Sequence, residues 1–181
     1  KIKNYITFIS FKNSLIDNKN TKKFNKTLII VNQYFPPDFA STGQLLEELA
    51  NSFKDENFNT KVLTGMPAYY FNTKFAKRIE RKENITIIRS KLSRIIPRKL
   101  YGKLFNSLLF CLRIFTHLIF LNKRDNLVIY TSEPPFLPAF AWFYYKITKI
   151  PYILLIYDIF PEILKSLDLI NKDNLLIKIW K

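Results

Sequence analysis

The sequence contains very little glycine, cysteine or histidine. Only three of its 181 residues are glycine, Cys111 is the single cysteine and His117 the single histidine. So few glycines exclude a glycine-rich nucleotide-binding loop, which needs several of them within a short segment. One cysteine cannot build a disulfide framework or a cysteine-based metal site. We therefore expect no metal and no cofactor, and a reducing cytoplasm as the compartment.

Acidic side chains are missing from a long central segment. Residues 84–124 contain no Asp or Glu but nine Lys and Arg, and the whole chain carries a formal net charge of +15. Such a bias predicts attraction to a polyanion, either nucleic acid or the anionic cytoplasmic face of a membrane. His117, within an apolar run of this segment, is expected to be a packed or interfacial side chain rather than a ligand.

The same segment includes a run, residues 104–121, that is apolar enough to raise the question of a membrane span. Arg113 lies near its middle, where a charged residue costs about 2.5–3.5 kcal/mol in a bilayer. We therefore expect a helix that packs on a sheet or lies on a membrane surface, not one that crosses it.

Apolar runs and helical periodicity together predict the fold class. Short runs rich in β-branched residues predict strands at 28–33, 60–64, 85–89, 127–131 and 152–157, and helical spacing predicts helices at 42–56, 101–121 and 135–148. This alternation predicts an α/β fold with a doubly wound, mainly parallel Rossmann-like sheet. Residues 68–83 are expected to form a loop with a short helix, and the Lys-rich residues 1–26 a poorly ordered basic leader.

Residues 26–53 hold the most informative local pattern, a strand, a proline-containing loop and a helix. Ser41 and Gln44 have the spacing of a capping box, with Ser41 as the N-cap of a helix that begins at Thr42. Gly43 then lies in the first turn, where it costs about 1 kcal/mol relative to alanine. Two interpretations are open: a ligand or another backbone approaches closely there, or the glycine is simply tolerated at a frayed helix start. The helix N-terminus offers free N–H groups to an anion such as a sugar phosphate.

Four motifs follow one another at the predicted carboxyl ends of the strands. They are QYFPPDFASTGQLLEELA at 33–50, TGMPAY at 64–69, TSEPP at 131–135 and DIFPE at 158–162. In this order they resemble the N-terminal domain of the retaining glycosyltransferases that have two facing Rossmann-like domains, the GT-B fold. The resemblance is strongest to the branch of family four that builds bacterial surface polysaccharides, and it covers about residues 27–170.

The resemblance implies a glycosyltransferase that transfers a sugar from a nucleotide-sugar donor to a lipid-linked or polysaccharide acceptor, at the inner face of the cell membrane. Residues 27–181 would be the N-terminal, acceptor-side domain, and the C-terminal domain that holds most donor contacts is absent from the chain. We therefore expect this fragment to be inactive alone.

The resemblance also implies the site residues. Thr42, Gly43 and Gln44 are candidate substrate-binding residues, and Asp158 is the candidate catalytic residue. Asp158 has an equally open alternative role as the N-cap of a helix that Pro161 begins. At Tyr157 many relatives have a histidine, which weakens any transfer of a catalytic role to that position. Glu133 is expected to be a solvated loop residue, and Gly43→Val to block ligand approach with little effect on folding.

Three other classes of function compete with this interpretation. One of them, a purely structural or pseudo-enzyme fragment, stays open because the donor domain is absent. A dinucleotide-dependent oxidoreductase is disfavoured, because two prolines stand where the tight glycine turn of that fold belongs. A non-catalytic basic module that binds a membrane or nucleic acid is the main alternative, since charge alone supports it. The sequence has no DNA- or RNA-binding motif, so no nucleic-acid partner is expected.

Overall fold

The computed structural model describes residues 27–38, 40–53, 59–67, 76–91, 100–121 and 126–157. Its elements, in chain order, are β1 (Thr27–Val31), α2 (Ser41–Ser52), β2 (Asn59–Gly65), β3 (Ile79–Lys82), β4 (Ile85–Ser90), α3 (Leu100–Phe120), β5 (Asn126–Thr131), α4 (Leu137–Thr148) and β6 (Tyr152–Leu155). The predicted leader at 1–26 and the helix predicted from Pro161 lie outside the described residues.

A mainly parallel sheet forms the centre of the molecule, which confirms the predicted fold class. Its strands lie in the order β3-β4-β2-β1-β5-β6, and every neighbouring pair is parallel except β3 with β4. β1 lies inside the sheet, where Ile30 pairs with Val62 on one side and with Ile129 on the other. All five predicted strands and all three predicted helices within the described residues are present, with ends shifted by a few residues.

The prediction of a loop with a short helix at 68–83 was wrong at residues 79–82. Residues 79–82 form the edge strand β3, which pairs antiparallel with β4. The two strands are joined by a turn in which Glu83 has a positive φ of 49°. β3 has the sequence Ile-Glu-Arg-Lys, and only Glu80 is not exposed. Such an edge strand is held by backbone pairing and carries charges, so it has no apolar periodicity to reveal it.

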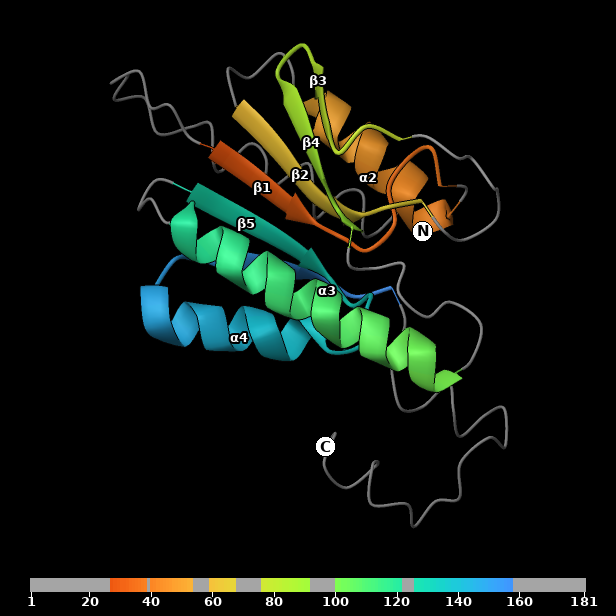
Figure 1. Ribbon diagram of the computed structural model, residues 1–181. Helices are drawn as coiled ribbons and strands as arrows, with labels where there is room; N and C mark the ends of the chain where they lie inside the picture. The colour runs from red at the N-terminus through yellow and green to blue at the C-terminus, as the bar shows by residue number, and fades with distance from the viewer. Residues whose placement is uncertain are drawn as a thin grey trace.

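The helices cover the two faces of the sheet unequally. Figure 1 shows α2 on one face and both α3 and α4 on the other. Side chains alternate along a strand, so each strand contributes to two cores. The core under α2 contains Leu28, Ile30, Leu46, Ala50, Val62 and Ile87, and the core under α3 and α4 contains Ile29, Val31, Leu63, Phe110, Cys111, Ile114, Tyr130 and Tyr144. β1 is therefore buried from both sides, as its continuous apolar run predicts.

Cys111 lies fully inside the core under α3. Burial raises the pKa of its thiol to about 12. A thiolate is the nucleophilic form of cysteine, so this side chain remains in its unreactive form near neutral pH.

The start of α2 differs from the predicted capping box. The N-cap is Ala40, whose φ of −93° and ψ of 133° are extended, and no side chain caps the helix. The backbone N–H of Gln44 donates to the Ala40 carbonyl oxygen at 3.1 Å. Ser41 is thus the first helical residue, one position earlier than the capping pattern predicts.

Within the part of the chain that the structure describes, no helix is long and apolar enough to cross a membrane.

Leu46 and Leu45 offer a matched test of this packing. Leu46 of α2 is fully buried, whereas its neighbour Leu45 is 51% exposed. We expect Leu46→Ala to lower the free energy of unfolding by about 2–5 kcal/mol, because it leaves a cavity between α2 and the sheet. Leu45→Ala should change it by less than about 0.5 kcal/mol. Equilibrium urea unfolding measures both, and equal losses would contradict the placement of α2.

Candidate functional site at the carboxyl edge of the sheet

The loop that follows β1 is held by the end of β2. The Asn32 N–H donates to the Leu63 carbonyl oxygen at 3.2 Å. The Gln33 carbonyl oxygen accepts two hydrogen bonds, from the Gly65 N–H at 3.0 Å and from the Thr64 hydroxyl at 3.1 Å. Because Thr64 and Gly65 begin the TGMPAY motif, the first two motifs of the sequence are joined directly at this edge.

The same loop is held on its other side by the loop that follows β5. The hydroxyl of Thr131 lies 2.8 Å from both the Asn32 Oδ1 and the Glu133 carbonyl oxygen, and the two acceptors share its one hydrogen. The Asn32 side-chain amide in turn donates to the Tyr34 carbonyl oxygen. Asn32 and Thr131 are completely buried. A buried polar pair that is satisfied in this way fixes the relative position of the two loops.

The loop after β5 also reaches the end of β6. The Ser132 N–H donates to the Leu155 carbonyl oxygen at 2.9 Å, and the Tyr157 N–H donates to the Ser132 hydroxyl at 3.1 Å. Burial raises the pKa of the Tyr157 phenol. This side chain is therefore a neutral hydrogen-bond donor near pH 7.

Of the predicted substrate-binding residues, Thr42 makes a hydrogen bond that joins the start of α2 to the loop after β5. Its hydroxyl donates to the Glu133 Oε2 at 3.3 Å, across 91 positions of sequence. The expectation that Glu133 is a solvated loop residue was wrong, because it is half-buried and bonded to α2. A carboxylate at the first turn of a helix is stabilised by the partial positive charge there. Gln44 is exposed beside this contact.

Gly43 is explained by the protein's own backbone. A Cβ atom at this position would lie 3.3 Å from the Phe35 Cα and 3.3 Å from the Tyr34 carbonyl oxygen. The interpretation in which another backbone approaches closely therefore accounts for the glycine without a ligand. Gly43→Val would press a branched side chain against the loop, which would have to shift by a few tenths of an ångström to admit it. The expectation that this change has little effect on folding stays a prediction.

The fourth motif and part of the second lie outside the described residues. Asp158, the candidate catalytic residue, and Glu162 belong to that part of the chain, as do Ala68 and Tyr69. Tyr157, directly before Asp158 in the sequence, is the last residue that the structure describes.

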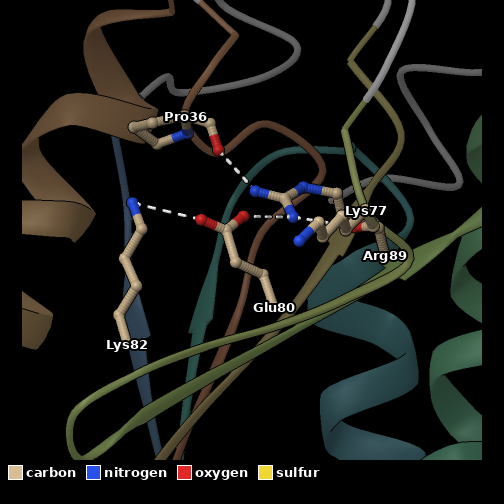
Figure 2. Close-up of polar contacts among 5 residues, drawn as sticks. All are labelled: Pro36, Lys77, Glu80, Lys82 and Arg89. Atoms are coloured by element: carbon tan, nitrogen blue, oxygen red, sulfur yellow. Dashed lines mark hydrogen bonds and ion pairs between the residues drawn. The ribbon is translucent and has the colours of Figure 1, made fainter.

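Arg89 is the residue of this edge that the sequence did not reveal. Its side chain is only 1% exposed, and Nη1 donates to the Lys77 carbonyl oxygen at 3.0 Å and to the Glu80 Oε2 at 2.8 Å. Its Nη2 donates to the Pro36 carbonyl oxygen at 2.8 Å (Figure 2). One guanidinium thus joins β4, β3 and the proline loop. In β4, Arg89 follows Ile85 and Ile87 at every second position, which was the available signal that it points inward.

The charge of Glu80 is held by two cations. Burial by itself would raise the pKa of its carboxyl, but the hydrogen bonds and positive charges of Arg89 and Lys82 outweigh burial and lower the pKa. The Lys82 Nζ lies 3.3 Å from the Glu80 Oε1. Glu80 is thereby kept ionised, and Arg89 has a counter-ion for its buried charge.

Comparisons with known proteins add little to this geometry. No protein-family model matches the chain, and no curated protein matches its sequence. Among solved structures, the chain is similar to an α,α-trehalose 6-phosphate synthase from Burkholderia multivorans, with a TM-score of 0.43 and 13% identity. The match covers 78% of this chain and 35% of the synthase chain, so this chain spans about a third of that protein's length.

The described residues contain no group of three or more His, Cys, Asp or Glu placed to hold a metal ion.

The lowered pKa of Glu80 gives a pH-dependent prediction. A carboxyl whose pKa is lower in the folded state stabilises the fold above the unfolded-state value, near 4.5, and loses that contribution as the pH falls through the folded-state value. We expect Glu80→Gln to lower the free energy of unfolding by about 1–2 kcal/mol at pH 7, since it removes a charged partner of Arg89. The deficit relative to wild type should shrink steadily below pH 4.5.

The exposed Glu48 of α2 provides the control for this measurement. Glu48→Gln should change the unfolding free energy by less than about 0.5 kcal/mol at every pH. Urea unfolding followed at a series of pH values tests both variants. A Glu80→Gln deficit that stays constant with pH would contradict the ion pair.

Proposed function

We propose that the natural protein containing this chain is a retaining glycosyltransferase of the family-four type, with this chain as the N-terminal, acceptor-side half of a GT-B fold. It transfers a sugar from a nucleotide-sugar donor to a lipid-linked or polysaccharide acceptor. The observation that carries the proposal is that the described parts of three motifs meet at one carboxyl edge, through the contacts of Gln33, Thr64, Thr42 and Glu133. Ligands of doubly wound folds bind at this edge.

The first turn of α2 supplies the chemistry that the reaction needs from this domain. Negative charge develops on the leaving diphosphate, and preorganised N–H donors stabilise such charge effectively. The first N–H groups of a helix have no partner within it, and no side chain caps α2. Thr42 is oriented by Glu133 beside these donors. Gly43 acts indirectly in this proposal, because it allows the loop at Tyr34 and Phe35 to approach the helix start.

Asp158 is proposed to act at the same edge. It directly follows Tyr157, whose N–H is bound by Ser132 of the loop after β5. An Asp at this place could hold the acceptor or the transferred sugar through its charge, or cap the following helix through its oxygen atoms. Asp158→Asn separates the two roles, because asparagine caps a helix as well as aspartate does.

Activity of the natural full-length protein tests the site. Thr42→Val keeps the shape of the side chain but removes the hydroxyl, and we expect turnover with a nucleotide-sugar to fall about tenfold, the cost of one lost polar contact to a charged group. Asp158→Asn should reduce turnover by at least about a hundredfold if its charge takes part in the reaction. Both variants should unfold at the wild-type midpoint within a few degrees.

The control variant is Thr116→Val, which makes the same change on an exposed position of α3. Its turnover should equal that of wild type. Full turnover in both single variants, Thr42→Val and Asp158→Asn, would remove the basis for the assignment. The isolated 181-residue chain is expected to transfer no sugar.

We propose that the acceptor is membrane-bound, because of the side chains on the outer surface of α3 and α4. The two helices lie side by side on one face of the sheet (Figure 1). They expose large apolar side chains to solvent: Leu104, Phe105, Leu108, Leu112, Ile119 and Phe120 of α3, and Trp142, Phe143, Tyr145 and Ile147 of α4. Lys146 of α4 lies over the ring of Trp142, and Lys149, the C-cap residue of α4, lies over the ring of Tyr145. Apolar side chains with cations beside them favour peripheral binding to an anionic membrane, here the inner face of the cell membrane.

Vesicle binding tests this proposal. Phe120 is 88% exposed on α3, whereas Ile79 is 55% exposed on the edge strand β3, away from this surface. We expect Phe120→Ser to weaken binding to vesicles containing phosphatidylglycerol about tenfold, the approximate value of burying one aromatic ring. Ile79→Ser should leave binding unchanged. Binding that favours short nucleic-acid duplexes over these vesicles would support the non-catalytic nucleic-acid module instead.

A further inference from the structure

A pocket of about 220 Å³ lies between α3 and the end of β4. Its floor is apolar and is formed by Leu63, Ile88 and Ile114. These side chains belong to the face of the sheet covered by α3, whereas α2 lies on the other face (Figure 1). None of Thr42, Gly43 and Gln44 lines the pocket, although Arg89 both lines it and holds the loop at Pro36. The pocket is therefore distinct from the predicted substrate-binding residues and adjoins the carboxyl edge at Arg89.

The walls of the pocket carry positive charge and no negative charge. Arg78, Arg89, Lys91 and Arg113 line it together with His117, and no Asp or Glu of the described residues does. The charge of Arg89 is already balanced by Glu80. Arg78, Lys91 and Arg113 form no ion pair with a carboxylate of the described residues. Three cations from three different segments thus line one concave surface without a counter-ion among the described residues.

His117 reports the strength of this positive field. Burial lowers its pKa, and the charges of Arg113 and Arg78 lower it further. Lys91 and Arg89, at the end of β4, also line the pocket. The imidazole is therefore neutral near pH 7. An anion bound in the pocket would offset the positive charges around His117. The pKa of the imidazole would then rise, and the side chain could take up a proton.

We propose that this pocket binds a phosphate-class dianion, the phosphate group of a soluble phosphomonoester or of a lipid headgroup. The guanidinium groups of Arg113 and Arg78 can each present paired N–H donors to phosphate oxygens. Lys91 supplies a flexible point charge at the exposed rim. The apolar floor lowers the local dielectric constant, which strengthens each of these contacts. The volume accommodates the phosphate group and a small polar body attached to it.

Both sources of the phosphate are compatible with the position of the pocket. Arg113 and His117 belong to α3, the helix that also exposes Leu108, Leu112 and Phe120. A lipid held against these apolar side chains could place its headgroup in the pocket. A soluble phosphomonoester could enter from the solvent-exposed side of Arg78 and Lys91.

Titration of the 181-residue chain with glycerol phosphate and with sulfate, in a chloride buffer, tests the site by NMR shifts and calorimetry. We expect saturable binding, with shifts concentrated at Ser90, Lys91, Arg113 and His117. Arg113→Gln should weaken binding about tenfold, which corresponds to about 1.4 kcal/mol. Arg81→Gln is the matched control, because Arg81 is exposed on β3 outside the pocket, and it should change the affinity less than twofold.

A pH series with sulfate isolates the histidine, because sulfate keeps its charge over the range in which imidazole titrates. The pKa of His117 is lowered in the free protein and raised by the bound anion, so binding takes up a proton and tightens as the pH falls. His117→Gln should flatten this dependence while preserving binding at pH 8. This readout would not change if His117 served only to pack α3.

Vesicles distinguish the two sources of phosphate. Vesicles with phosphatidic acid, a phosphomonoester, should bind in an Arg113-dependent manner if the source is a lipid, and more tightly than vesicles with phosphatidylglycerol at equal charge. Glycerol phosphate binding without this preference identifies a soluble source. Absence of saturable binding by sulfate, glycerol phosphate and phosphatidic acid alike, or equal losses in Arg113→Gln and Arg81→Gln, would overturn the proposal.

Discussion

The burial of β1 between two strands and two helical layers is the constraint on which the rest of the structure depends. Ile29, Ile30 and Val31 have no exposed face, so this strand cannot shift by one residue without moving every side chain into the wrong core. The register of β1 fixes where it ends, and therefore where Asn32 and Gln33 meet the ends of β2 and β5. The candidate site is positioned by the core rather than by its own loop.

Polar contacts at this edge hold the loop after β1, in addition to the burial of Phe35 in the core under α2. Arg89 donates a hydrogen bond to the Pro36 carbonyl oxygen, and the Thr131 hydroxyl donates to the Asn32 Oδ1. Gly43 allows α2 to pack closely against the loop. Each contact joins segments distant in sequence. A buried arginine is costly unless its charge is balanced, and Glu80 provides the opposite charge. The edge strand β3 thus contributes the carboxylate that balances the charge of the buried arginine.

Much of the fold could be predicted from the sequence, because the strands buried on both faces produce continuous apolar runs such as residues 28–31. β3 could not, since a charged edge strand leaves no periodic signal. The N-cap was displaced to Ala40 by loop geometry, which a capping pattern cannot encode. For the site, the order of motifs placed Thr42 and Gly43 in a helix that follows the carboxyl end of β1, as in the structure. The ion pair of Arg89 with Glu80 and the contact of Thr42 with Glu133 depend on tertiary packing that no local pattern shows.

The buried position of Cys111 has a practical consequence for work with this protein. A protonated thiol inside the core under α3 is shielded from alkylating reagents as long as the helix remains seated on the sheet. Because Cys111 is the single cysteine of the chain, every modified molecule must have opened at this one place. The rate at which Cys111 is alkylated therefore reports how often α3 separates from the sheet. Mass spectrometry can follow this rate without an introduced probe.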